Sequence, residues 1–254
     1  MNRLSSWLFA LGNAAGGLAF FWPFLVGDIS TGTARVVPFA WAIALPIVLL
    51  IAIESLLRAR NDVRLLAMIA ALAALAAASR PLGAGAAGLE PIWTVLLLSG
   101  RALGARAGFV IGALAMTVSA MVTGGIGPWL PYQVMVAAWV GASASLLPNV
   151  RGRSETLLLS ALGAITGIIT GALLNLWFWP LAVGISPEIS FVPGASGMSN
   201  IVHWLRYGML TSAGFDIPRA LITAALLFVA APKLLPILRR ATRRASFTAV
   251  ITEQ

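Results

Sequence analysis

The chain has 254 residues, of which 59% are apolar and only 10% are charged, and its mean hydropathy is +0.93. These values exclude a soluble globular domain and are typical of a protein that crosses the membrane several times. The absence of cysteine and the single histidine exclude disulfides, thiolate or multi-histidine metal sites and a cysteine nucleophile. The formal charge of +9 lies in short gaps between apolar runs and forms no single basic stripe, which argues against nucleic-acid binding.

Eight apolar runs predict membrane-spanning helices, at about 20 residues per crossing. The first resembles a signal peptide as far as Gly17, but FFWPFLV follows directly and makes the run long enough to cross a bilayer, so we interpret it as a retained span. The fourth is interrupted by Glu90 and Pro91, and both a full and a partial crossing stay open for it. In chain order the runs are Ser5–Val26, Val37–Leu57, Leu65–Ser79, Gly88–Gly100, Ala107–Val122, Tyr132–Leu147, Thr156–Val183 and Ile217–Ile237.

The distribution of basic residues orients these spans, because cytoplasmic loops are enriched in Lys and Arg. With both termini in the cytoplasm, only Arg35, Arg80, Arg206 and Arg219 lie between spans on the outer side. The basic residues that then fall inside are Arg58, Arg60, Arg64, Arg101, Arg106, Arg151, Arg153, Lys233, Arg239, Arg240, Arg243 and Arg244.

The long connection between the seventh and eighth runs contains IVHWLRYGML, residues Ile201–Leu210. Counting it as a ninth span would put the basic tail outside. Because the segment is rich in aromatic residues of the interfacial type, we predict a short helix that lies at the outer surface and is a candidate lid.

The charge cluster RARNDVR at 58–64 separates two bulky, proline-containing runs from an Ala-rich and Gly-rich remainder. We therefore predict an all-α integral membrane protein with three parts. Residues 1–60 form a two-span N-terminal extension, residues 61–240 form a six-helix membrane core, and residues 241–254 form a basic cytoplasmic tail.

Small residues recur at four-residue spacing in two runs, which favours close helix–helix contact in lipid. The seventh run carries Gly163, Gly167 and Gly171. Two interpretations stay open from the spacing alone, packing inside this chain and contact with a separate subunit. The residues predicted to bind a partner subunit are Ala67, Ala70, Ala71, Ala74 and Ala78 of the third run.

Aromatic and amide side chains converge on the predicted outer face, which is the usual composition of a small-molecule pocket. Each tryptophan is also compatible with an interfacial belt, and each amide with a helix–helix hydrogen bond. The candidate substrate-binding residues are Trp93, Trp129, Tyr132, Gln133, Asn175, Trp179, His203 and Arg206.

Three sequence features resemble the substrate-specific S components of energy-coupling factor (ECF) transporters, which import vitamins. They are the Ala-x-x-x-Ala spacing at Ala70 and Ala74, the Gly-rich stretch Gly104–Gly112 within EPIWTVLLLSGRALGARAGFVIGALA, and the segment Gly127–Gln133 within GGIGPWLPYQVMVAAWVG. The likeness covers roughly residues 64–239, and the first two runs depart from it.

This resemblance implies a six-helix protein of the bacterial plasma membrane that holds a vitamin in an outward-facing pocket closed by loops. The Ala-x-x-x-Ala face would contact a transmembrane coupling subunit driven by two ATPase subunits, and the loaded protein would topple to release its vitamin inside. The chain has no G-x-x-x-x-G-K-[ST] motif, so another chain would hydrolyse the ATP. The Trp-rich outer region favours a large ring system, for which we expect a cobalamin-type ligand.

An intramembrane serine protease is one alternative, because Gly194-Ala195-Ser196-Gly197 matches the Gly-x-Ser-Gly element of rhomboid-like proteases. However, His203 follows Ser196 by seven residues, which is about 10 Å along a helix and too far for a nucleophile and its base. We therefore expect no enzymatic activity, no metal and no cofactor.

An ion-coupled secondary transporter is the other alternative, but such carriers bury ionisable groups at mid-membrane depth. Here Glu54 and Glu90 lie near span ends. The carboxylates expected in loops are Asp28, Asp62, Glu155, Glu188 and Asp216.

Overall fold

The computed structural model describes residues 3–25, 30–58, 63–83, 88–182 and 185–252, and this part of the chain is helical with no strand. The prediction of an all-α fold is confirmed. Val26, Asp28, Asp62 and the domain boundary predicted at 60/61 lie outside the described residues. The helices are α1 Arg3–Leu25, α2 Thr31–Arg58, α3 Val63–Ser79, α4 Pro91–Leu103, α5 Ala105–Thr123, α6 Leu130–Ser143, α7 Arg153–Phe178, α8 Gly197–Thr211 and α9 Ala213–Thr252, with short 3₁₀ turns η1 Pro81–Gly83, η2 Ala144–Leu146, η3 Trp179–Leu181 and η4 Pro187–Ile189.

Four segments are long and apolar enough to cross a membrane, namely Val63–Gly83, Ala105–Thr123, Arg153–Leu181 and Ala213–Thr242. They correspond to the third, fifth, seventh and eighth predicted runs. Helix α4 has 13 residues and is about 20 Å long, less than the roughly 30 Å of a hydrocarbon core. The sequence allowed either a full or a partial crossing of the membrane by the fourth run. The length of α4 favours the partial crossing.

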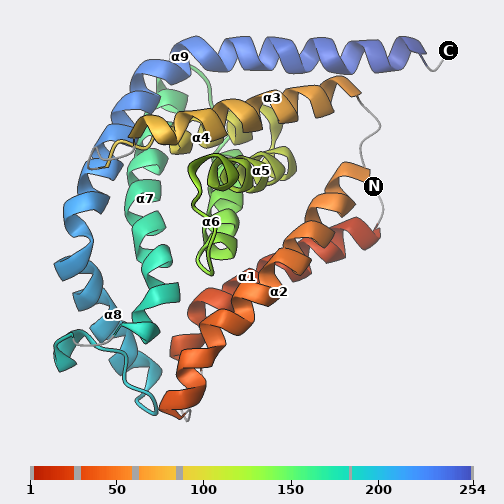
Figure 1. The fold of residues 1–254 in the computed structure, drawn as a ribbon. Helices are drawn as coiled ribbons and strands as arrows, with labels where there is room; N and C mark the ends of the chain where they lie inside the picture. The colour runs from red at the N-terminus through yellow and green to blue at the C-terminus, as the bar shows by residue number, and fades with distance from the viewer. Residues whose placement is uncertain (1–2, 26–29, 59–62, 84–87, 183–184, 253–254) are drawn as a thin grey trace.

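The arrangement in Figure 1 places α7 and α9 side by side, with α5 and α6 packed against each other and α1 and α2 paired along one flank. Helix α9 contains Pro218, Pro232 and Pro236, and a proline inside a helix removes a backbone hydrogen bond and promotes a bend. The end of α9 accordingly turns away and runs across the top of the view.

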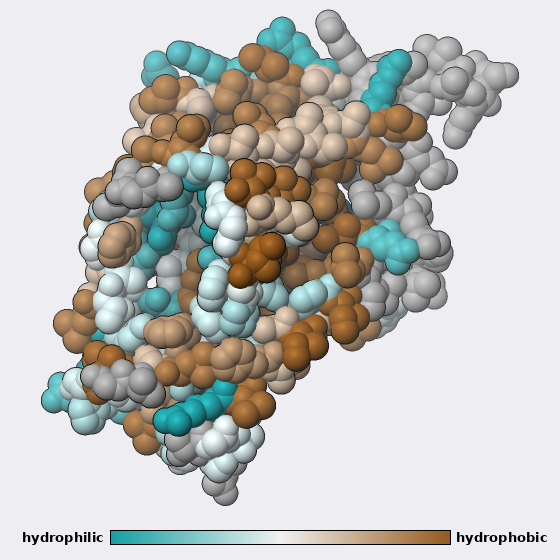
Figure 2. All heavy atoms as spheres, viewed as in Figure 1, coloured by the Kyte–Doolittle hydropathy of each residue, from teal (hydrophilic) through white to brown (hydrophobic). Residues whose placement is uncertain are grey.

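The molecule exposes many large apolar side chains, and Figure 2 shows them over much of the visible face. Val122 is 74% exposed, Phe228 55% and Ile165 52%. Apolar surface on this scale is unfavourable in water and is suited to contact with lipid.

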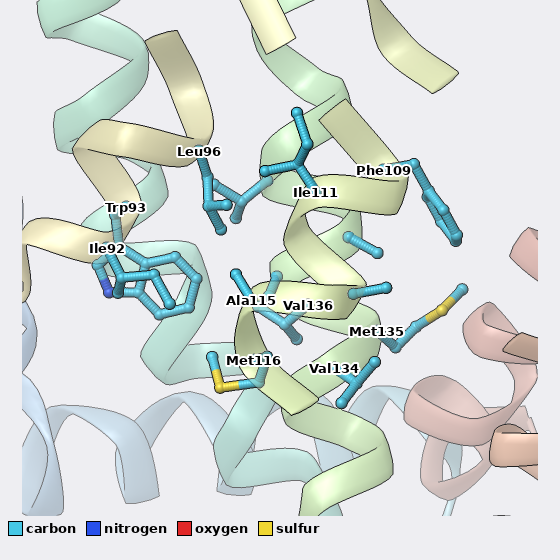
Figure 3. Close-up of a cluster of buried hydrophobic side chains, with 14 of the residues drawn as sticks. Ile92, Trp93, Leu96, Phe109, Ile111, Ala115, Met116, Val134, Met135 and Val136 are labelled. Carbon is cyan, nitrogen blue, oxygen red and sulfur yellow. The ribbon is translucent and has the colours of Figure 1, made fainter. Parts of the chain in front are cut away.

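Glycines bring α4, α5 and α6 into backbone contact. A Cβ atom on Gly100 would lie 1.8 Å from the carbonyl oxygen of Gly141, and one on Gly108 would lie 2.0 Å from the same oxygen. Neither position therefore accepts a larger residue without movement of the backbone. Figure 3 shows buried apolar side chains of α4, α5 and α6 that pack together in the core, among them Trp93, Leu96, Ile111, Met116 and Val136.

We predict that Gly108→Ala lowers the free energy of unfolding by about 1–3 kcal/mol, because the added methyl group overpacks a backbone contact. The matched control is Gly17→Ala on α1, where a Cβ atom has no neighbour within 4 Å and alanine raises helix propensity. Unfolding in detergent measures both variants. Equal stability of Gly108→Ala and Gly17→Ala would contradict the packing described here.

Candidate functional site

One group of the predicted substrate residues forms an aromatic cluster at the start of α6. The ring centroid of Trp177 lies 6.2 Å from that of Trp129 and 5.9 Å from that of Tyr132. Trp129 is 37% exposed, whereas Tyr132 is fully buried and its hydroxyl donates to the carbonyl of Pro38 at 2.8 Å. The cluster therefore joins the core to α2.

A second aromatic cluster lies beneath α8. Trp179 is fully buried, and its indole N–H donates to the carbonyl of Ile189 at 2.7 Å. Its ring meets Phe191 edge-on at 5.3 Å and lies 6.2 Å from Phe24. Phe24 also contacts Trp204 of α8, so this cluster connects α1, η3 and α8.

The predicted helix at Ile201–Leu210 is confirmed as α8. Ser196 caps its first turn by accepting a hydrogen bond from the Ser199 amide at 3.2 Å. Tyr207 faces the bundle, and burial raises the pKa of its phenol. The opposite face is apolar and exposed, as in helices that lie in a membrane interface, and carries Met198, Val202, Leu205 and Met209.

The predicted polar residues mostly bind other groups of the chain. Gln133 accepts a hydrogen bond from Arg80 at 3.4 Å, and Asn175 donates to Ser212 at 2.6 Å. The Nδ1–H of His203 donates to the carbonyl of Ser190 at 2.9 Å.

Trp93 is buried and donates to the carboxylate of Glu90. Arg206 is exposed and forms no ion pair with a described residue.

The serine-protease alternative gains no support from the positions of Ser196 and His203. Ser196 is occupied as the cap of α8 and His203 binds a loop carbonyl, so no hydrogen bond joins them in the described part of the chain. Among the described residues, no cluster of histidine and carboxylate side chains could hold a metal ion.

An ionic network at the predicted outer end was missed from the sequence. Arg219 Nη1 lies 2.6 Å from Asp216 and Nε lies 3.1 Å from Glu90, and Nη1 also donates to the Gly167 carbonyl. The expectation that Asp216 lies in a loop is wrong, because α9 begins at Ala213 and buries this carboxylate against Gly171 of α7.

A second ionic network joins α4, α7 and α9 at the opposite end. Glu155 accepts from Arg101 Nε at 2.6 Å and from Arg239 Nη1 at 2.9 Å. Arg101 also donates to the carbonyls of Leu147 and Pro148. Glu155 was expected in a loop, but it lies in the first turn of α7 and its side chain is only 5% exposed.

We predict that Glu155→Gln lowers the free energy of unfolding by about 3–5 kcal/mol, because two largely buried arginines lose the charge that neutralises them. The control is Glu188→Gln in η4, where the side chain is exposed and a change within about 0.5 kcal/mol is expected. Thermal unfolding in detergent compares the two. Indistinguishable unfolding would show that the network contributes no stability.

Two cavities adjoin this second network. The larger, of about 990 Å³, lies between α7 and α9, and the smaller, of about 240 Å³, shares Arg151 and Arg239 with it. None of the eight predicted substrate residues lines either cavity. Seven of the eight instead contact other residues of the chain, and Arg206 is exposed.

The two stripes of small residues have different environments. Cβ atoms on Gly163, Gly167 and Gly171 would clash with Leu227, Ala220 and Asp216, so this stripe packs against α9 inside the chain. The predicted partner-binding residues of α3 are instead exposed, and they are Ala67, Ala70, Ala71, Ala74 and Ala78. The opposite face of α3 is buried and includes Ile69, Leu72, Ala73, Ala76 and Ala77.

Comparison with family models, curated proteins and solved structures found no match for this chain.

Proposed function

We propose that this protein is the substrate-binding S component of an ECF-type importer in a bacterial plasma membrane, which captures a vitamin outside and delivers it with a coupling subunit and two ATPase subunits. The exposed face of α3 is the observation that carries the proposal. Small side chains at Ala70 and Ala74 leave room for close backbone approach by a second transmembrane helix, which is a main source of helix association in lipid. The other face of α3 is already used by the chain's own core.

The substrate side of the proposal rests on the two aromatic clusters and on α8. Indole and phenol rings at Trp129, Tyr132 and Trp179 offer stacking and apolar contact to a large ring system, for which a cobalamin-type vitamin is the proposed ligand. Trp129 and Tyr132 now contact Trp177, and Trp179 contacts Phe191, so binding would require these ring contacts to open. Helix α8 is the proposed lid, because its Trp204 contacts Phe24 of the second cluster and α8 therefore lies against that cluster.

We predict that the double variant Ala70→Trp/Ala74→Trp loses co-purification with an ATPase-bearing partner and retains vitamin binding. Two indoles would prevent close approach by the partner helix. The matched control is Ile165→Trp/Ile169→Trp, which places the same pair at the same spacing on the exposed face of α7. Affinity capture from native membranes measures the association, and undiminished capture of the Ala70/Ala74 variant would remove α3 as the coupling surface.

Ligand capture is tested by mass spectrometry of small molecules extracted from the purified protein, followed by titration with cobalamin and riboflavin. A retained or bound vitamin is the expected result. Recovery of no vitamin, together with no binding of either probe, would contradict the proposal.

We predict that Gln133→Leu weakens binding of the recovered vitamin about tenfold, equivalent to about 1.4 kcal/mol, because it removes one amide from the substrate region and leaves Arg80 without that acceptor. Isothermal titration measures the affinity, and an unchanged melting temperature shows that folding is intact. If the Gln133→Leu variant binds the vitamin with the affinity of the wild type, Gln133 has only a structural role.

An ion-coupled secondary transporter is a second candidate, favoured by the buried carboxylates Glu155 and Asp216. Each forms an ion pair with arginine inside the chain, and a carboxylate held in such a buried pair is poorly placed to carry protons across the membrane. Vitamin uptake into proteoliposomes that contain this chain alone distinguishes the two classes. An S component requires its ATP-hydrolysing partners, whereas a secondary transporter needs only an ion gradient.

A further inference from the structure

The larger cavity is a groove between the inner parts of α7 and α9. Farther along the same helices, Gly163 and Gly167 allow α9 to lie directly against α7. Near the inner end α9 carries Pro232 and Pro236, and both line the groove. Because prolines promote a bend, the helices separate there. The apolar part of the lining consists of Leu157, Phe228, Ala231, Pro232, Leu235 and Pro236.

The inner end of this groove is strongly basic. Four arginines and one glutamate line it, which leaves a formal excess of three positive charges. Glu155 is engaged by Arg239 and by Arg101 from outside the groove. Arg151 and Arg153 are exposed and form no ion pair with a described residue, and Arg240 is exposed with its Nε donating to the Pro236 carbonyl.

The smaller cavity extends this basic end. It is lined by Arg101, Ala102, Asn149, Arg151, Arg239 and Thr242, and it shares two of its arginines with the groove. The two cavities together form a site with one long apolar part and one compact polar part that is rich in hydrogen-bond donors. A ligand that fits both parts must itself be amphipathic and carry negative charge at one end.

We propose that this composite site binds one anionic phospholipid, with an acyl chain along Leu157 and Phe228 and its phosphate against Arg151, Arg153 and Arg240. Guanidinium groups pair bidentately with phosphate oxygens. Basic pockets between transmembrane helices on the cytoplasmic side, where the positive charge bias puts this end, suit anionic headgroups. An apolar partner helix would leave these arginines unpaired, and a free anion would leave the apolar groove unfilled.

The experiment measures lipid retention by native mass spectrometry of the full chain, released from nanodiscs that contain equal amounts of phosphatidylglycerol and phosphatidylcholine. The wild type should retain phosphatidylglycerol preferentially. Arg151→Gln/Arg153→Gln should reduce that preference about 30-fold, since each basic side chain at a membrane surface contributes roughly a factor of five. Arg35→Gln/Lys233→Gln removes the same charge from exposed residues that do not line the site, and it should retain the wild-type preference.

The apolar part of the site is tested separately. Leu157→Trp places an indole in the groove from an exposed position, and it should reduce retention of both lipids without unfolding the protein. Leu221→Trp adds the same side chain at a similarly exposed residue of α9 outside the groove, and it should have no effect. Equal retention of the two lipids by the wild type, or equal losses in the test and control variants, would overturn the proposal.

Discussion

The structure depends on the pairing of charges that are buried inside an apolar bundle. A charged group away from water is destabilising unless an opposite charge and hydrogen bonds compensate for it. Arg101, Glu155 and Arg239 meet this requirement at the predicted inner end, and Glu90, Asp216 and Arg219 meet it at the predicted outer end. One network joins α4 to α9 and the other joins Glu90, the N-cap residue of α4, to α9. Each also contacts α7, through Glu155 or through the Gly167 carbonyl.

The two networks connect some helices by ion pairs, and we call these helices the frame. The other helices are attached to the frame mainly by apolar contacts. Helices α4, α7 and α9 form the frame, and α5 and α6 join it through backbone contacts at Gly108 and Gly141. Helix α8 is held largely by aromatic rings and by loop hydrogen bonds such as that of His203. In the proposed cycle the frame keeps its shape, α8 moves to admit substrate, and α3 presents its small face to another subunit.

Hydropathy predicted most helices but few of the side-chain environments. The apolar runs located α3, α5, α7 and α9 because these helices contact both the core and the apolar surroundings. Asp216 was misplaced since hydropathy assigns charged residues to water and does not register that Arg219 lies one turn away on the same helix. The same limitation hid the pairing of Glu155 with arginines 54 and 84 residues distant in sequence.

For the candidate sites, residue spacing indicated which side chains belong together, but only the packing of the helices determines whether they are exposed or covered. Four-residue spacing identified the stripes at Ala70–Ala74 and Gly163–Gly171, but only the fold distinguishes an exposed stripe from one covered by α9. Trp129, Tyr132 and Trp179 were predicted to bind substrate, and the sequence could not indicate that their rings contact Trp177 and Phe191 within the chain. The groove between α7 and α9 was not predicted from the sequence. It is lined by Pro232 and Pro236, where α9 bends, and by arginines that the sequence analysis used only to orient the spans in the membrane.

The central claim is that the two aromatic clusters, one at the start of α6 and one beside α8, open to receive a solute. Cryo-electron microscopy of the protein in lipid nanodiscs, with and without saturating cobalamin, tests it most directly. The account predicts ligand density beside Trp129 and Trp179, with Trp129 moved away from Trp177, Trp179 moved away from Phe191 and α8 displaced from its present position. Identical ring packing in both samples, with α8 unmoved and no density among the clusters, would contradict it.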